Sequence, residues 1–403
     1  MIKVFNNLKA PDFKQFEIVE VKGKGHPDSV VDAIADEISR RYSQYCLEHF
    51  GHICNHWVDK CVLIGGESEF EFGHSRMVNP MRLLVIGKAT THVGDHEIPM
   101  QRIARAAADA VLSDIVDIYD PQRDLVVDIM TNCYQGAGRK DAWYRPTGGD
   151  IPSQVNMIEA NDAVICSGHA PFSLVEDITR DLGDHFYSEA FRADHPFIGT
   201  DIKVICQRVS DDIQVTACIP FKASLCPDRA FYDRELENIR TLIADRVQRR
   251  LNAQGGERGI TFGIDLNTRD TDDVVYMSHY GSCLDTGDVG AVGRGNRTSG
   301  LITPARPMSI EAPAGKNPRY HSGKILDLAA RWIATDVHDS LGLKCEVTIS
   351  TQTGRPLNDP LCTIIQIDGA ADVAAARACE ELARGVLHNV RDITDDFVRG
   401  AVA

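Results

Sequence analysis

The stretch from Gly290 to Lys324, GAVGRGNRTSGLITPARPMSIEAPAGKNPRYHSGK, concentrates positive charge in a chain that is otherwise acidic. The 403 residues include 43 Lys and Arg against 58 Asp and Glu, a formal net charge of −15. A basic pocket inside an acidic protein suits a compact anion such as a nucleotide, and it argues against a broad nucleic-acid surface. Within this stretch Glu311 is the only acid, and the bases are Arg294, Arg297, Arg306, Lys316, Arg319 and Lys324.

Glycine and proline are frequent in the same stretch, and both favour anion binding there. Glycine lets backbone N–H groups approach an anion closely, whereas proline stiffens the loop and lowers the ordering cost of binding. The segment is not a Walker A loop, because EAPAGK lacks the first glycine and is followed by Asn317; GRGNRT does not complete G-x-G-x-x-G. The composition favours a phosphate site, and the alternative is a solvated basic loop.

The second candidate is GKGHPDS, from Gly23 to Ser29. His26 and Asp28 stand where a predicted strand meets the N-terminus of a predicted helix, a place that attracts anions. A histidine there could neutralise a developing oxyanion, and Asp28 could carry Mg²⁺ to phosphate oxygens. The alternative is that Asp28 simply caps the helix.

Further candidates are acids beside glycines and a single lysine. Glu67 follows LIGG, and Asp288 lies in DTGDVG. A carboxylate in such a position can hold an amine or a metal, although it is more often a turn residue. Asp162 in ANDAVICSGHAP is equally ambiguous, and Lys203 in GTDIKVIC could be a solvated lysine at the start of a strand.

The elements that must position these residues are mixed helices and strands without strict alternation, which favours the α+β class. Apolar residues at helical spacing predict a long helix over 26–51 and others over 98–115, 229–256 and 323–342. Strands are expected at 61–67, 81–89, 124–131, 201–209, 212–221, 260–267, 345–351 and 361–368. The Gly/Pro-rich stretch 135–150 is the candidate for a gating loop.

The bulk composition predicts a cytoplasmic enzyme. No apolar run approaches the roughly 18 residues of a membrane helix, and the N-terminus lacks the apolar core of a signal peptide. The 12 cysteines include no C-x-x-C pair, so they are expected to be buried hydrophobes. On the residues alone, a kinase, a phosphohydrolase, a nucleotidyl transferase and a transferase that expels the whole phosphate chain all remain open.

Taken together and in order, these stretches resemble the archaeal-type S-adenosylmethionine synthetases (methionine adenosyltransferases). The resemblance rests on GKGHPDS, IGGE, ANDAVICSGHAP, DIKV, GDVGAVGRGNRTSGLITPARPMSIEAPAGKNP and HSGK. It implies an enzyme that transfers the adenosyl group of ATP to the sulfur of L-methionine, forming S-adenosylmethionine and releasing phosphate and diphosphate. It also implies Mg²⁺ and often K⁺, and a homodimer with active sites at the subunit interface.

The implied fold has three interleaved sheet-plus-helix domains in a pseudo-threefold arrangement. The expected central domain combines 25–145 with 284–324, which includes the phosphate loop. The N-terminal domain combines 1–24 with 172–283, and the C-terminal domain combines 146–171 with 325–403.

The resemblance also assigns roles to residues. His26 would stabilise the bridging oxygen as the bond breaks, and Asp28 would bind Mg²⁺. Glu67 and Asp288 would hold the methionine amino group or support the metal site, and Asp162 would lie by the adenosine. Residues expected to hold the phosphates are Lys203, Arg294 and Lys316, with Arg297, Asn317, His321 and Lys324 around them.

Two stretches depart from the family pattern. NDAVICSGHAP has Cys166 and His169 in place of the usual residues, and HYGSCLDTGDVG has Val289 where a second acid is usual. Two alternatives therefore remain: a variant with a changed thioether or nucleobase, and a metal-dependent triphosphate or nucleotide hydrolase. A third, a catalytically silent subunit, is disfavoured because His26, Asp28, Arg294 and Lys316 are all present.

Overall fold

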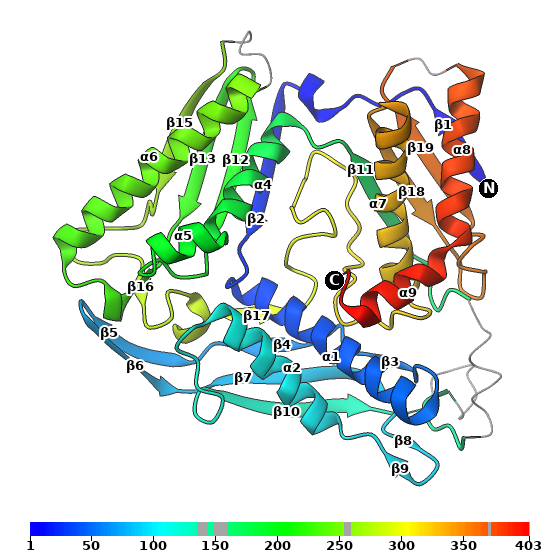
Figure 1. Ribbon diagram of the computed structural model, residues 1–403, viewed down its shortest axis with the longest axis horizontal. Coiled ribbons are helices and arrows are strands. Elements are labelled where there is room, and N and C mark those ends of the chain that lie inside the picture. The colour runs from blue at the N-terminus through cyan, green and yellow to red at the C-terminus, as the bar shows by residue number, and fades with distance from the viewer. Residues whose placement is uncertain (135–142, 149–158, 254–258, 370–371, 403) are drawn as a thin grey trace.

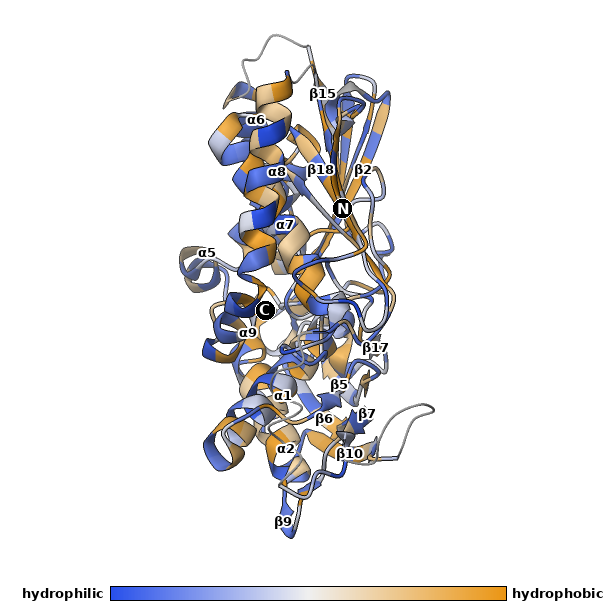
Figure 2. Ribbon diagram, turned by 90° about the vertical axis from the view of Figure 1, so that its right-hand side faces the viewer, coloured by the Kyte–Doolittle hydropathy of each residue, from blue (hydrophilic) through white to orange (hydrophobic). Residues whose placement is uncertain are grey.

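The computed structural model describes residues 1–134, 143–148, 159–253, 259–369 and 372–402. Within them, the chain folds into three units, each a sheet of four or five strands covered by helices on one face (Figure 1). Figure 2 shows the helices on one side of a flat molecule and the sheets on the other. The predicted α+β class is confirmed. We name the units after the helices α1, α4 and α7.

The α1 unit holds the sheet at the bottom of Figure 1. The N-terminal helices α1 (Pro27–Phe50) and α2 (Met100–Ile115) cover it. A hairpin of β5 (Glu67–Glu71) and β6 (His74–Asn79) follows β4, and β8 (His92–Val93) pairs with β9 (His96–Glu97). The strands of the sheet are, in spatial order, β10 (Leu125–Asn132), β7 (Met81–Ala89), β4 (Val62–Ile64) and β17 (Val289–Ala291), with β3 (His56–Trp57) also on β7.

The α4 unit is covered by α4 (Leu174–Phe186) and α6 (Arg229–Ala253), with the short α5 (Glu189–Asp194) beside them. The small pair β14 (Phe221–Lys222) and β16 (Met277–Ser278) lies apart from its main sheet. The strands of that sheet are β15 (Thr261–Leu266), β13 (Asp212–Cys218), β12 (Lys203–Val209) and β2 (Phe16–Lys22).

The α7 unit joins the two ends of the chain. Its helices are α7 (Ser322–Leu341), α8 (Val373–His388) and α9 (Val390–Arg399). Its strands are, in spatial order, β1 (Ile2–Phe5), β19 (Cys362–Ile367), β18 (Cys345–Ser350) and β11 (Ile165–Ala170).

The three sheets share one pattern of strand directions. An edge strand runs parallel to its neighbour in the pairs β10–β7, β15–β13 and β1–β19, and the next two pairings in each sheet are antiparallel. This shared pattern supports the pseudo-threefold arrangement, although the sequence shows no repeat. The domain boundaries stay a prediction. However, the pairing of β1 with β19 places Ile2–Phe5 with the strands of 325–403, and not with those of 172–283 as expected.

Each unit has its own hydrophobic core, and α1 shows why the sequence produces it. Val31, Ile34, Ile38 and Tyr42 recur at helical spacing, and all four are buried against the α1-unit sheet. The side chains of the other two cores come from the same pairing of a sheet face with an apolar helix stripe. None of the helices that the structure describes is long and apolar enough to cross a membrane.

Asp28 does not cap helix α1, contrary to the alternative reading of the sequence. The N-cap is His26, whose Nδ1 accepts a hydrogen bond from the Asp28 amide at 3.1 Å, so N-capping by Asp28 is wrong. The Asp28 carboxylate is therefore available for other contacts. His321 caps α7 in the same way, accepting from the Gly323 amide at 3.2 Å.

Candidate functional site

The basic segment runs through the middle of the molecule, between the three units (Figure 1, yellow). It leaves β17, and its backbone is tied to the α1 unit by a hydrogen bond from Val292 to Cys61 and to the α4 unit by the bridge between Ile302 and Glu20. From there it leads into α7. It thus touches all three units, which makes it the structural centre of the chain.

Three aspartates on one face of α1 hold this segment by its backbone. Asp28 accepts a hydrogen bond from the Ala291 amide at 3.0 Å. Asp32 accepts from the Gly293 and Gly295 amides at 2.8 and 3.1 Å, and Asp36 accepts from the Gly315 amide at 2.7 Å. Because residues four apart lie on the same side of a helix, these carboxylates form a row beneath the segment.

The first group of predicted residues meets where α1, β2 and the start of the basic segment converge. Lys22 Nζ lies 2.8 Å from Asp28 Oδ2 and donates to the Arg294 carbonyl oxygen at 2.6 Å. Arg294 Nε lies 3.7 Å from Asp28 Oδ1, and the Arg294 side chain is 71% exposed. Lys203 pairs with Lys22 across the antiparallel strands β12 and β2, so both ammonium groups belong to the same face of the sheet.

The electrostatics of this group keep Asp28 ionised and His26 neutral. Burial favours the protonated Asp28, but hydrogen bonds from Lys22 and the Ala291 amide outweigh burial and lower the pKa of this carboxyl below its usual value. Burial lowers the pKa of His26, against the opposing effect of the Asp201 carboxylate. The sequence patterns pointed to neither Lys22 nor Asp201, although Asp201 stands two residues from Lys203.

Asp201 is buried beside His26 and is held by the segment that precedes the basic loop. Its Oδ2 accepts from the Cys283 amide at 2.9 Å and from the Tyr276 hydroxyl at 3.3 Å. Burial raises the pKa of Asp201 above its usual value. Asp201 therefore links the His26 neighbourhood to residues 276–283.

A second group lies deeper, around Lys316. Lys316 Nζ is buried and lies 2.8 Å from Asp59 Oδ2 and 3.3 Å from Glu311 Oε2. Lys324 is fully buried, pairs with Asp36 at 2.9 Å and lies 3.9 Å from the centre of the Phe397 ring. Both ammonium groups are thus already neutralised by carboxylates within the chain.

Asn317 and His321 have structural contacts of their own. The Asn317 side chain is buried and donates to the Cys54 carbonyl at 3.1 Å. His321 caps α7, and burial lowers its pKa to about 3, so its imidazole is neutral. Their assignment to the phosphate shell stays a prediction.

Several of the arginines in the basic segment also have partners within the protein. Arg297 Nη2 donates to the Gly293 and Gly295 carbonyls at 2.7 and 2.8 Å. Arg306 is buried and makes a bidentate ion pair with Glu176 at 2.7 and 2.8 Å. Part of the positive charge that the sequence concentrates here therefore holds units together.

The remaining predicted residues lie on the surface. Glu67 accepts from the Asn79 amide side chain at 2.5 Å, and its backbone bridges to Thr286, two residues before Asp288. Glu67 and Asp288 are both exposed and lie on adjoining segments, as a shared role requires. Asp162 is exposed, and its carbonyl accepts from Ser322 at the start of α7. Of the predicted gating loop 135–150, only 143–148 lies within the described residues.

The two residues that depart from the family pattern near Asp162 face into the protein. Cys166 is buried against α7, and burial raises its pKa well above the usual value. The His169 imidazole lies 3.6 Å from Glu176 and edge-on to Phe172. Neither substitution exposes a new group at the surface of the structure.

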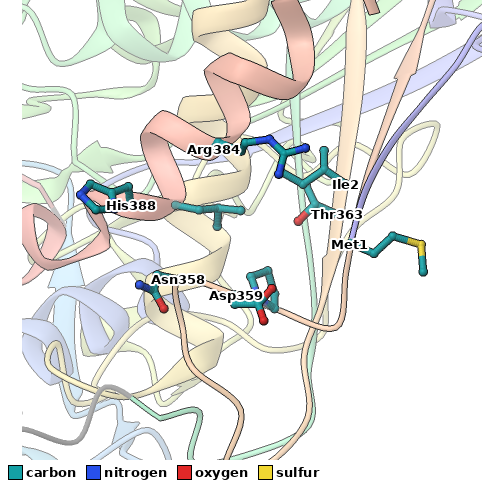
Figure 3. A pocket seen from close by; sticks show the side chains of 9 residues that line it. Met1, Ile2, Asn358, Asp359, Thr363, Arg384 and His388 are labelled. Carbon is teal, nitrogen blue, oxygen red and sulfur yellow. The ribbon is translucent and has the colours of Figure 1, made fainter. Parts of the chain in front are cut away.

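One cavity, about 1190 Å³, is lined by α1, α4, α7 and the loop at 296–300, and it reaches Asp32, Asp36 and Arg297 from the helical side. A smaller one, about 220 Å³, lies near β1 and α8, with Arg384, His388 and Asp359 around it (Figure 3). None of the predicted site residues lines the smaller cavity. In the described part of the chain, no three His, Cys, Asp or Glu side chains are arranged to hold a metal ion.

Comparison with known proteins identifies relatives along the whole chain. The model of the S-adenosylmethionine synthetase (AdoMet synthetase) family matches residues 2–401. An S-adenosylmethionine synthase from Caldivirga maquilingensis is 33% identical over 399 residues, covering 96% of this chain and 94% of the relative. Another, from Haloquadratum walsbyi, is 34% identical over 393 residues, again covering 96% and 94%. The structure of an S-adenosylmethionine synthetase from Campylobacter jejuni shares the fold, with a TM-score of 0.55 and 17% identity over 94% of this chain and 93% of that one.

Proposed function

Because the chain belongs to the S-adenosylmethionine synthetase family, which joins ATP and methionine, we propose that it transfers the adenosyl group of ATP to the methionine sulfur with the triphosphate held beside Lys22, His26 and Arg294. The observation that carries this proposal is the convergence of the cations Lys22 and Arg294 and the neutral imidazole of His26 with Asp28 at the start of α1. A thioether is a neutral nucleophile and needs no general base, so the difficulty of the reaction lies in its anionic leaving group. Preorganised cations contribute most at such a position.

In this arrangement His26 lies by the oxygen that leaves C5′. Its Nδ1 is occupied by the Asp28 amide, which leaves Nε2 as the group that can face the substrate. Arg294 and Lys203 hold phosphate oxygens from two units of the fold, and Lys316 supports the far end of the triphosphate. Alignment of sulfur, carbon and oxygen between these groups supplies the rest of the acceleration.

Members of the family use divalent metal ions, and the chemistry of Asp28 fits Mg²⁺. Mg²⁺ usually keeps several waters and is bound through one or two carboxylates together with substrate phosphates, so three protein ligands are not required. Asp28 is kept ionised by its hydrogen bonds, as a ligand must be. Bound there, Mg²⁺ would neutralise phosphate charge; K⁺ is a further candidate without an assigned position.

We also propose that the enzyme is a homodimer that pairs through its sheets. The sheet faces that no helix covers carry exposed apolar side chains in all three units, among them Ile18, Ile64, Met130, Ile165 and Val209. Exposed apolar side chains that recur on one face of a molecule favour burial against a partner. Lys22 and Lys203 lie at the edge of the same face, which supports active sites between the two subunits, with Glu67 and Asp288 near the methionine and Asp162 near the adenosine.

The test is to incubate the protein with ATP, Mg²⁺, K⁺ and methionine and to analyse the products by mass spectrometry. The proposal expects the sulfonium product together with phosphate and diphosphate. Phosphate release that does not depend on methionine would indicate a hydrolase instead, and no turnover would contradict both. Repeating the assay with CTP, GTP and UTP, and with other thioethers, tests whether the departures at Cys166, His169 and Val289 change specificity.

A further inference from the structure

We propose that Asp32 and Arg297 form a clamp on the turn Gly293–Arg294–Gly295, and that both are positioning residues for the triphosphate, acting through Arg294. This inference rests on the proposed function. It adds how the side chain of Arg294, proposed to bind phosphate, is positioned. The clamp consists of four hydrogen bonds to two residues. Asp32 accepts from the amides of Gly293 and Gly295, and Arg297 donates to the carbonyls of the same two residues.

The geometry of the clamp fixes both peptide groups that flank Arg294. The two Asp32 bonds measure 2.8 and 3.1 Å, and the two Arg297 bonds measure 2.7 and 2.8 Å. Bonds to ionised groups are roughly twice as strong as bonds between neutral groups. Each glycine is held at its amide by the carboxylate and at its carbonyl by the guanidinium. The peptide before Arg294 is thus held by Arg297 through the Gly293 carbonyl, and the peptide after it by Asp32 through the Gly295 amide, so rotation of either one would break a bond to a charged group.

The clamp matters because the segment around Arg294 is rich in glycine. Gly290, Gly293 and Gly295 fall within six residues of one another, and glycine has the largest backbone entropy to lose. Fixing one residue costs about 1–2 kcal/mol, so a turn that is ordered before ATP arrives binds it more tightly. Arg294 is 71% exposed and reaches only Asp28 at 3.7 Å, so the direction of its side chain depends on its backbone.

Asp32 and the turn are also fitted to each other in shape. A Cβ atom added to Gly295 would lie 2.3 Å from Asp32 Oδ2, so the carboxylate occupies the space that a side chain at position 295 would need. Burial raises the pKa of Asp32 to about 6 and the nearby Asp36 adds to this effect, whereas the Gly293 amide and Arg297 oppose it. Burial therefore disfavours the charged form of the Asp32 carboxylate, and its contacts with the turn stabilise that form.

The clamp assigns Arg297 a role different from direct phosphate contact, and a double-mutant cycle separates the two. We measure the Kd for Mg²⁺–tripolyphosphate by calorimetry, together with KM for ATP and for methionine, in Asp32→Asn, Arg297→Gln, Arg294→Ala and the double variants. Asp32→Asn removes one of two acceptors and is expected to weaken tripolyphosphate about tenfold, equivalent to about 1.4 kcal/mol, with KM for methionine unchanged. Arg297→Gln should have an effect of similar size.

The Kd values of the double variants distinguish a clamp that acts through Arg294 from independent effects of each residue. If Asp32 acts through Arg294, adding Asp32→Asn to Arg294→Ala should change the Kd by less than twofold, and Asp32→Asn with Arg297→Gln should resemble the worse single variant. Additive effects in both cycles would overturn the clamp. Glu37→Gln is the matched control, since Glu37 lies on the same helix and pairs only with Arg40 and Arg41; its Kd should match wild type.

The remaining outcomes are also informative. A purely structural effect would lower the active fraction and the melting midpoint without raising KM for ATP selectively, and it would count against the clamp. If Asp32→Asn does not fold, the cycle of Arg297→Lys with Arg294→Ala provides the same test, because a clamp again predicts less than a twofold change. Tripolyphosphate binding by wild type without sulfonium formation would refute the proposed function while leaving the clamp open to the same cycles.

Discussion

Replacement of Glu17 by Gln should make the protein more stable at pH 8 but not at pH 4. Glu17 lies on β2 and is fully buried at the junction between the α4 and α7 units. Burial raises its pKa from the usual 4.5 to about 7, the Ser173 hydroxyl opposes this by donating to Oε1 at 2.5 Å, and Glu176 and Asp12 raise it further. Arg208, at 3.7 Å, is too distant to compensate fully.

The sign follows from linkage between protonation and folding. The folded state holds the Glu17 proton more tightly than the unfolded chain, so this group contributes most below pH 4.5 and its contribution is lost as the pH rises through about 7. At about 1.4 kcal/mol per pKa unit, the loss amounts to roughly 3 kcal/mol. A glutamine keeps the acceptor for Ser173 and carries no charge, so the variant should not show this loss.

The assay is calorimetric unfolding of wild type and Glu17→Gln from pH 4 to pH 8, compared as the difference in unfolding free energy of the first transition. The difference should grow by roughly 3 kcal/mol in favour of the variant, mostly between pH 4.5 and pH 7. Glu71→Gln, at an exposed position, is the control and should give a flat difference. A difference that stays constant with pH would refute the reasoning, because it would show that Glu17 titrates alike in both states.

Three further predictions concern the site itself. His26→Ala should raise the barrier to sulfonium formation by about 2–4 kcal/mol, as loss of an oxyanion donor does, with a smaller effect on the Kd for ATP. Equal free-energy losses in catalysis and in ATP binding would argue against a place for His26 by the leaving oxygen. Gly290→Ala should disrupt the site, because the new Cβ would lie 2.1 Å from the Pro27 carbonyl oxygen, and an unchanged KM for ATP would contradict the structure. Lys316→Met should destabilise the protein by about 1–3 kcal/mol in urea unfolding, since it leaves the buried Asp59 with only the exposed Lys60 as its ion-pair partner; adding Asp59→Leu should restore stability but not tripolyphosphate turnover.

The sequence predicts a phosphate site in the basic segment, but it does not show which charges of that segment have partners within the protein. Arg294 and Arg306 have the same composition around them, yet Arg294 is 71% exposed and Arg306 is buried against Glu176. The difference depends on Glu176, which lies 130 residues away along the chain. A contact over that distance leaves no local pattern, so composition alone could not separate an exposed arginine from a buried, structural one.

The row of aspartates on α1 shows a signal that was present and unused. Asp28, Asp32 and Asp36 recur at intervals of four in a segment correctly predicted to be helical, so they had to share one face. What the sequence could not show was the partner of that face, because backbone amides of the basic segment carry no side-chain pattern. Likewise, the common strand pattern of the three sheets is a property of hydrogen bonding, and unrelated sequences can produce it.

The pairing of β1 with β19 constrains the order in which the protein can mature during its synthesis. Residues 2–5 emerge from the ribosome roughly 360 positions before their partners at 363–366. At about 5–20 residues per second, the first strand waits on the order of 20–70 s for its neighbour. The sheet of the α7 unit therefore closes only after residues 363–366 have emerged, and residues 2–5 lack their partner strand until then.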